Sequence, residues 1–191
     1  MPVQATLEAI RALLNPARVQ ACKDSTLTIK ESDAKASLRR VDIVSVGAQA
    51  FWVEYDQCEF PGHQVFAPHA NLHRACDAIA FCVVDNDAYI LCCELKSSVP
   101  NRHEVAEQLR NAECFLIYLD TLLQCYPDKN NQKHSIKNWP RRYFVFHNQG
   151  ASSMDKRPSR DLSNNDAPHK AMFVPYDGSR IMARKLLGKP L

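Results

Sequence analysis

The chain has 191 residues, of which 46% are apolar, and a formal net charge of +3. This length allows one domain with a sizeable core, and a mild positive charge does not by itself indicate a nucleic acid partner. The longest apolar runs, residues 78–84 and 89–93, are too short to cross a bilayer, which needs about 20 apolar residues. Because Glu8 and Arg11 interrupt the N-terminal segment, no signal-like apolar core is present there, and we expect a cytoplasmic protein without a membrane partner.

Periodicity predicts one helix and several strands in the first third of the chain. Residues 3–14 carry apolar side chains at helical spacing, and Asn15-Pro16 ends the run. Three segments alternate like strands, namely residues 25–31, 41–46 and 50–55. The next segment, residues 56–74, is expected to be a loop with about one helical turn.

The clearest pattern is a β-hairpin followed by a long helix. Residues 77–84 and 89–96 are both strand-like, and turn-forming residues separate them. Residues 101–125 carry an apolar stripe at helical spacing. Asn101 is a candidate N-cap for this helix, with Glu104 as its capping-box partner.

The last third of the chain is less regular. Residues 128–140 are polar and basic, which predicts a surface loop, and residues 141–147 predict a buried strand. Residues 152–170 have few apolar side chains and are expected to form a long mobile loop. A last strand is expected over residues 171–174, followed by a basic helix over about 178–187.

This order of elements predicts an α/β fold in a single domain. We expect residues 1–150 to form the core. Residues 151–191 are expected to add the mobile loop, the final strand and the basic C-terminal helix, packed on the same domain.

Three charged residues of the hairpin indicate a chemical site. Glu94 and Lys96 are two positions apart, so they share one face at the end of an otherwise apolar strand. Pairing through a turn at residues 85–88 places Asp77 roughly across from Lys96, and a small register offset lets Asp77 and Glu94 converge. Two carboxylates so close repel each other unless a cation lies between them, and magnesium suits oxygen ligands. The backbone carbonyl of Leu95 is a candidate third ligand.

The combination of Asp77, then Glu94-Leu95-Lys96 on the next strand, then a long helix resembles the PD-(D/E)XK nuclease superfamily. The resemblance covers roughly residues 3–147, although Cys76 stands where a proline often precedes the Asp. It implies a restriction-endonuclease-like domain with an α-β-β-β-α-β core, in which helices flank a mixed central sheet. It also implies magnesium-dependent cleavage of DNA, less often RNA, with Mn²⁺ as a possible substitute.

The resemblance assigns roles to individual residues. Asp77, Glu94 and Lys96 would be catalytic, and the metal ligands would be Asp77, Glu94 and Leu95. Some relatives use a Gln of the long helix to support the Lys or a water, which makes Gln108 a candidate against a plain surface glutamine. Others use a Glu of the first helix, which makes Glu8 a candidate against a solvated helix residue.

Basic residues outside this motif are candidates for nucleic-acid binding. Arg141 and Arg142 follow Trp139-Pro140, which could stack on nucleic acid or instead enter the core. The C-terminal segment from Gly178 has no acidic residue and carries further cations. Those chosen as candidates are Arg180, Arg184 and Lys185, with a solvated helix face as the alternative.

The sequence also leaves room for zinc. The ligand types Cys58, His63, His69, His73 and Cys76 lie within one short stretch, although their spacing matches no zinc pattern. No Cys-x-x-Cys pair occurs among the eight cysteines, and Cys82, Cys92 and Cys93 lie in apolar strand-like runs. Reduced, buried thiols are the expectation for these three.

These observations predict a magnesium-dependent nuclease, and we expect an endonuclease that cleaves double-stranded DNA. Restriction, phage defence and DNA repair are the natural settings for such an enzyme. A homodimer or a subunit of a larger nuclease or defence complex is the expected working form. The alternative is a catalytically inactive nuclease-fold subunit that binds nucleic acid or protein.

Overall fold

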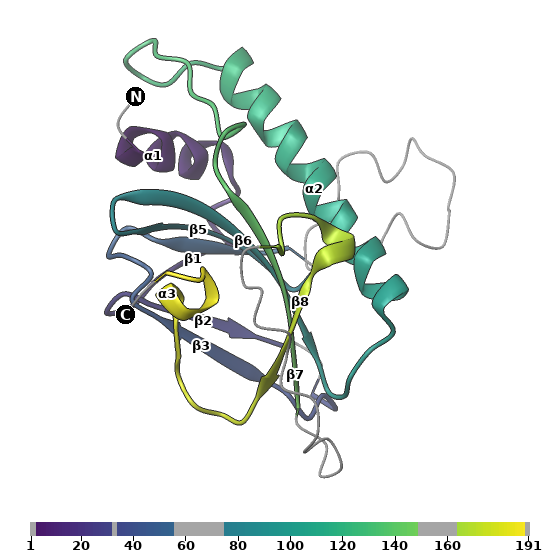
Figure 1. Cartoon of the computed structure of the whole chain (residues 1–191). Coiled ribbons are helices and arrows are strands. Elements are labelled where there is room, and N and C mark those ends of the chain that lie inside the picture. Colours follow the sequence, from purple (N-terminus) through teal and green to yellow (C-terminus); the bar gives the residue numbers. More distant parts are fainter. Residues whose placement is uncertain (1–2, 32–33, 56–74, 149–163, 190–191) are drawn as a thin grey trace.

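The computed structural model describes residues 3–31, 34–55, 75–148 and 164–189. These residues form three layers, in which two helices, a larger sheet and a smaller sheet lie one on another (Figure 1). The fold is therefore mixed α/β, which confirms the predicted class. No helix in these four ranges is long and apolar enough to span a membrane.

The larger sheet has six strands within the described residues and follows the order β1-β4-β5-β6-β7-β8. Its strands are β1 (Val19–Ala21), β4 (Phe51–Glu54), β5 (Ala78–Val84), β6 (Asp87–Lys96), β7 (Arg141–Asn148) and β8 (Met172–Tyr176). Neighbouring strands from β1 to β6 run antiparallel, whereas β7 runs parallel to both β6 and β8. The sheet is therefore mixed, and the β5–β6 hairpin lies at its centre.

Two helices cover one face of this sheet. They are α1 (Val3–Leu13) and α2 (Arg102–Cys125), and each buries one apolar stripe. The core beneath them includes Leu7, Ile10, Ile79, Phe81, Leu109, Leu116 and Tyr143. Asn101 caps α2, because its side-chain oxygen accepts a hydrogen bond from the backbone N–H of His103 at 2.9 Å. The C-terminal end of α2 lies near α1, and its first turns lie at the far side of the sheet (Figure 1).

The other face of the larger sheet packs against a three-stranded sheet. This sheet contains β2 (Thr26–Lys30), β3 (Arg40–Val44) and β9 (Ile181–Met182). β2 and β3 run antiparallel, and β9 lies parallel to β3. The short helix α3 (Ala183–Leu186) follows β9 directly.

The C-terminal segment differs from the prediction. The basic helix expected over residues 178–187 is wrong in extent, because helical structure covers only Ala183–Leu186. Gly178 has a φ of +91°, which belongs to a turn, and β9 then extends along β3. Tertiary pairing with β3 therefore overrides the helical pattern of this segment.

The loop expected over residues 152–170 is also partly corrected. Its last seven residues have a defined structure that includes the 3₁₀ helix η1 (Pro168–Lys170), which lies against α2. Asn165 is buried, and its backbone oxygen accepts a hydrogen bond from the Tyr143 N–H at 3.1 Å. This contact joins the segment to the edge of the main sheet.

Some predictions concern residues outside the described ranges. The loop expected over residues 56–74 lies there, together with four of the five candidate zinc ligands, Cys58, His63, His69 and His73. Residues 152–163 of the expected mobile loop lie there as well. Cys76, the remaining candidate ligand, is fully buried.

Candidate active site

The register of the central hairpin places two carboxyl groups side by side. Ala78 pairs with Cys93, so the next step along both strands brings Asp77 opposite Glu94. Asp77 therefore lies opposite Glu94 and not opposite Lys96, which is two positions further along β6; this is the register offset that lets the two carboxyl groups converge. The physical reason is the turn, which contains only Asp85 and Asn86, with φ values of 55° and 68°. Two consecutive positive φ values are typical of the tight type I′ turn, and this turn fixes the register.

All three charged residues of the motif start from the same face of the sheet. Glu94 alternates with Cys92 and Ile90, which pack in the core under the helices. Asp77 lies two positions before Ile79, which packs in the same core. Lys96 follows Glu94 by two positions, so the motif faces α2 at the end of the hairpin.

Short polar contacts connect these residues. Asp77 and Glu94 are only 8% and 2% exposed. The Lys96 ammonium lies 2.5 Å from Glu94 Oε1, and the Asp77 backbone N–H donates to Glu94 Oε2 at 3.3 Å. Asp77 Oδ2 in turn accepts a hydrogen bond from the Leu95 backbone N–H at 2.5 Å. The structure therefore brings together the three residues that the sequence assigned to catalysis.

Burial destabilises the ionised form of Glu94. Desolvation raises the pKa of Glu94 to about 7, although Lys96, the Asp77 N–H and Gln108 all favour its ionised form. Desolvation lowers the pKa of Lys96, but the attraction to Glu94, its hydrogen bond and the charges of Asp77 and Glu104 together outweigh it, so this pKa is also raised. Lys96 is 26% exposed and keeps its ammonium charge, so Glu94 is the group of this pair that gains or loses a proton near neutral pH.

Gln108 belongs to the same cluster. It lies on α2, and its side-chain amide lowers the pKa of Glu94. Its Nε2 donates to the backbone oxygen of Ala75 at 3.4 Å. Its Oε1 is buried and has no hydrogen-bond partner among the described residues. The amide therefore presents one unused acceptor beside the carboxylates, where a water molecule or a ligand hydroxyl would satisfy it.

Glu8 is not brought to this cluster. It is exposed on α1, where its carboxylate accepts a hydrogen bond from Gln4 at 3.3 Å. The buried face of α1 lies near the C-terminal end of α2. The Thr6 hydroxyl forms a hydrogen bond with the His134 ring, and the backbone N–H of His134 donates to the Leu123 carbonyl of α2. This placement favours the solvated alternative for Glu8, and its catalytic role stays a prediction.

The candidate nucleic-acid-binding arginines also lie away from the cluster. Arg141 opens β7 beside Ile90, and its guanidinium lies 3.5 Å from Glu113. Arg142 is its neighbour and donates to the Arg141 carbonyl at 2.9 Å. Since β7 rises about 3.3 Å per residue, roughly 20 Å separate its start from the end that adjoins Lys96.

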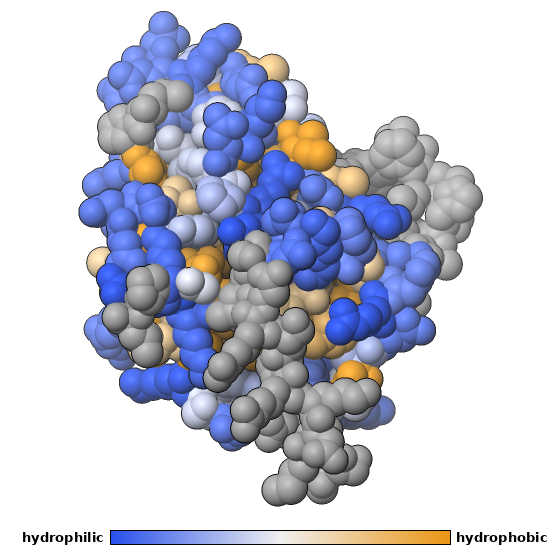
Figure 2. Space-filling view, in the orientation of Figure 1, coloured by the Kyte–Doolittle hydropathy of each residue, from blue (hydrophilic) through white to orange (hydrophobic). Residues whose placement is uncertain are grey.

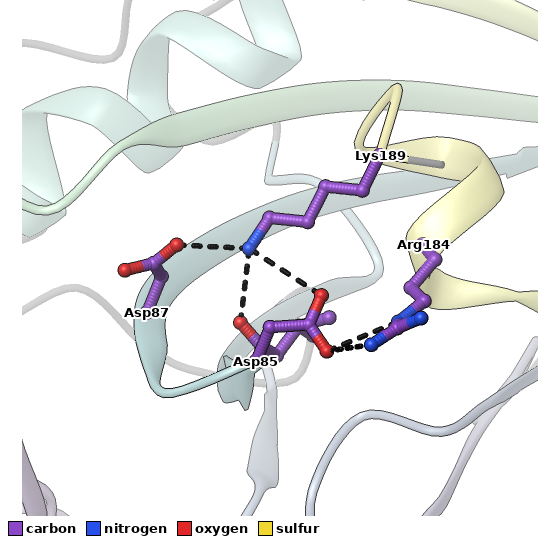
Figure 3. Close-up of polar contacts among 5 residues, drawn as sticks. Asp85, Asp87, Arg184 and Lys189 are labelled. Atoms are coloured by element: carbon purple, nitrogen blue, oxygen red, sulfur yellow. Dashed lines mark hydrogen bonds and ion pairs between the residues drawn. The ribbon is translucent and has the colours of Figure 1, made fainter. Parts of the chain in front are cut away.

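The C-terminal cations gather at the hairpin turn instead. Arg184 pairs with Asp85, and Lys189 lies 2.9 Å from Asp87 and 3.7 Å from Asp85 (Figure 3). Arg180 and Lys185 are exposed. Arg184 therefore fastens α3 to the turn, and none of these cations adjoins the carboxylate cluster.

Sequence reasoning missed one residue at this end of the sheet. His147 lies directly beside Lys96 in the parallel pairing of β6 and β7, on the same face, and is 7% exposed. A polar residue that ends an apolar strand was the signal that singled out Glu94 and Lys96, and it applies equally to His147. The signal gains weight only when the register is known, because residues 96 and 147 are far apart in sequence.

No group of three or more His, Cys, Asp or Glu side chains that could hold a metal occurs among the described residues. A metal at this site would therefore need the Leu95 carbonyl or water in addition to the carboxylates of Asp77 and Glu94. Comparison of the chain with protein-family models, curated proteins and solved structures found no match.

Proposed function

We propose that the chain is a magnesium-dependent nuclease that hydrolyses phosphodiester bonds, with DNA as the substrate and endonucleolytic cleavage as the activity. The observation that carries the proposal is the pair Asp77 and Glu94, two buried carboxyl groups that face each other beside Lys96. A folded chain rarely buries adjacent carboxyl groups unless they have a partner or a chemical role.

The order of the elements supports the finer fold assignment. Within the described residues, α1, β4, β5, β6, α2 and β7 give the α-β-β-β-α-β order that the resemblance implies, with β1, β2 and β3 as additional strands between α1 and β4. Asp77 precedes β5, and Glu94 and Lys96 end β6, as the superfamily motif requires. These agreements favour a restriction-endonuclease-like domain as the setting of the site.

The donor set fits a magnesium ion. Asp77 and Glu94 offer carboxylate oxygens at neighbouring register positions, and hard oxygen ligands are those that magnesium prefers. The Leu95 N–H points toward Asp77, and the carbonyl of a strand residue points to the same side as its N–H. The Lys96 ammonium holds Glu94 Oε1, so a cation is already favoured at this position. When bound, magnesium would lower the pKa of a water and stabilise charge on the phosphate.

Lys96 and Gln108 have separate roles in this proposal. Lys96 keeps its charge and is partly exposed, so its ammonium can neutralise charge that develops on a phosphate oxygen. Gln108 Oε1 has no hydrogen-bond partner among the described residues, so this acceptor can orient the attacking water. Mn²⁺ should replace magnesium, since it accepts the same oxygen ligands.

The setting of the activity is proposed by analogy alone. Restriction, phage defence or DNA repair in the cytoplasm, with a homodimer or a partnered subunit as the working form, would suit a small nuclease domain.

Plasmid cleavage tests the proposal. Supercoiled DNA is incubated with the full chain and magnesium, manganese or a chelator, beside Asp77→Ala, Lys96→Ala and the control Asp87→Asn. Asp87 is an exposed carboxylate at the other end of the same hairpin. Cleavage by the wild type and the control, with loss in both site variants and with chelator, supports the nuclease. Equal cleavage by all variants would contradict the site assignment.

The alternative is a nuclease-fold subunit that binds without cleaving. The contact of Lys96 with Glu94 Oε1 is compatible with this alternative, because an ion pair can satisfy the buried carboxylate in a purely structural role. Absence of cleavage of every DNA and RNA tested, together with measurable nucleic-acid binding, would favour this reading over the enzyme.

A further inference from the structure

The candidate active site continues across the sheet as two rows of side chains. In the first row, Glu94 pairs with Val145, which pairs with Phe173. In the second row, Lys96 pairs with His147, which pairs with Pro175. Register partners share one face of a sheet, so both rows face α2. Phe173 lies two strand spacings, or about 10 Å, from Glu94.

Arg102 covers the end of the first row. Its guanidinium carbon lies 4.5 Å from the centre of the Phe173 ring, and the residue is exposed. No ion pair with Arg102 occurs among the described residues. An arginine seated on a ring is held in place while its N–H edge stays available to a ligand.

His147 lies beside Lys96 in the sheet and near the Phe173 ring that Arg102 contacts. Its ring centre lies 6.4 Å from that of Phe173, so the same aromatic side chain positions both groups. Nδ1 lies 3.1 Å from the Asn148 carbonyl oxygen, which requires Nδ1 to be the protonated donor. Nε2 is then the ring nitrogen that remains for a ligand.

We propose that Arg102, held on Phe173, and His147 form a subsite for a backbone phosphate of the nucleic acid, next to the phosphate that is cleaved. This inference rests on the proposed function and names where the substrate strand runs. The strand crosses from the carboxylate pair, past Lys96 and His147, to the first turn of α2. Arginine suits this task because its planar fork bonds two phosphate oxygens at once.

The acidic side chains of α2 that are nearest to Arg102 in sequence contact other groups. Glu107 lies 3.7 Å from His103. Glu104 contributes to the raised pKa of Lys96 and so lies toward the catalytic end. The arginines first assigned to nucleic acid lie at the other end of the sheet, and Arg102 takes over their expected role at this end.

Binding measured without cleavage tests the subsite. Fluorescence anisotropy of a labelled duplex and of a labelled single strand is recorded in chelator over a range of salt concentrations. The proteins are the full-length wild type, Arg102→Gln, Arg102→Lys, His147→Gln and the control Arg110→Gln, an exposed arginine two turns along the same helix. Circular dichroism melting shows whether each variant remains folded.

We expect Arg102→Gln to weaken binding about tenfold and to reduce the salt slope by about one, since one phosphate contact is lost. Arg102→Lys should recover only part of the loss, because an ammonium cannot form the bidentate contact. His147→Gln should weaken binding by a smaller factor. Arg110→Gln should bind like the wild type.

Three outcomes would overturn the subsite: no binding by the wild type, equal losses in Arg102→Gln and Arg110→Gln, or no loss in Arg102→Gln. Plasmid cleavage separates this from the proposed function. If the wild type does not cleave DNA but Arg102→Gln alone loses binding, the phosphate subsite is supported and the nuclease function is contradicted. If cleavage requires Glu94 but Arg102→Gln changes neither the binding affinity nor KM, the nuclease function is supported and the subsite is contradicted.

Discussion

The two ends of the β5–β6 hairpin carry similar charged groups in opposite surroundings. At the open end, Asp77 and Glu94 are buried and Lys96 approaches them. At the turn, Asp85 and Asp87 face cations of the C-terminal segment in partly exposed positions (Figure 3). Each end has two carboxyl groups. Within the described residues, Arg184 and Lys189 face those of the turn, and Lys96 approaches those of the open end.

The difference lies in solvation. At the turn, the partner Arg184 lowers the pKa of Asp85, so its carboxylate is stabilised by folding. At the open end, burial raises the pKa of Glu94, so its carboxylate is destabilised by folding. The described surface on the face shown in Figure 2 is mainly hydrophilic, as is usual where water solvates charged side chains. Ion pairing at the turn stabilises the folded chain. The destabilised carboxylate at the open end supports the proposed metal site.

The largest expected effect is on catalysis. Glu94→Gln removes one proposed metal ligand and should reduce the single-turnover cleavage rate about a thousandfold or more. Asp85→Asn removes a carboxylate of the turn and should leave the rate within about twofold. The rates are measured with excess enzyme and magnesium on one labelled duplex. Equal rates for Glu94→Gln and the wild type, or an equal loss in both variants, would contradict the contrast between the two ends.

Much of this contrast could be predicted from the sequence. Alternation alone assigned Glu94 and Lys96 to one face, and turn-forming residues located the hairpin. The register could not be predicted, because Asp85-Asn86-Asp87 is compatible with several turn lengths. A shift of two residues decides whether Asp77 faces Glu94 or Lys96, and the two-residue turn with its positive φ values settles it.

Contacts between distant segments were out of reach for a different reason. His147 lies beside Lys96 because β6 and β7, which α2 separates in sequence, pair in parallel. Arg102 reaches Phe173 because β8 pairs with β7. Both are tertiary events with no local pattern. The same holds for Arg184, whose basic segment gave a plausible nucleic-acid contact until its partner Asp85 was known.

The second expected effect is on the pH dependence of stability. The pKa of Glu94 in the folded chain is about 7, above its ordinary value, so the folded state holds the extra proton between about pH 4.5 and 7. Stability should therefore fall as pH rises through this window. Glu94→Gln removes the buried charge and should be more stable than the wild type by about 1–3 kcal/mol at pH 8. The advantage should vanish below about pH 4.5.

Urea unfolding at several pH values measures this effect. Asp85→Asn is the matched comparison, because the hydrogen bond with Arg184 lowers the pKa of Asp85. The ionised Asp85 therefore stabilises the folded chain at pH values above its ordinary pKa, and this stabilisation is lost as pH falls below that value. Asp85→Asn should therefore be less stable than the wild type at pH 7, with the gap closing in acid. A gain in stability at pH 8 that persists at pH 4 in Glu94→Gln would show that burial of its charge is not the cause.

A smaller effect is expected from the cation that joins α3 to the turn. Arg184→Ala removes the contact with Asp85 and should lower stability only slightly, since exposed ion pairs contribute little. The loss should shrink in 1 M salt, because salt screens exposed charges. Lys185→Ala is the control, as Lys185 is exposed on the same short helix. Equal losses in both variants would mean that the helix, and not the ion pair, matters.

The smallest expected effect tests the turn that sets the register of the whole site. Asn86 has a φ of 68°, a conformation that glycine adopts without strain and that asparagine tolerates. Asn86→Gly should therefore raise stability by about 0.3–0.5 kcal/mol and leave cleavage unchanged, because the two-residue turn and the facing of Asp77 and Glu94 are kept. Insertion of one glycine after Asn86 lengthens the turn and should reduce cleavage strongly while the protein remains folded. If cleavage survives the insertion, the register of the hairpin does not govern the site.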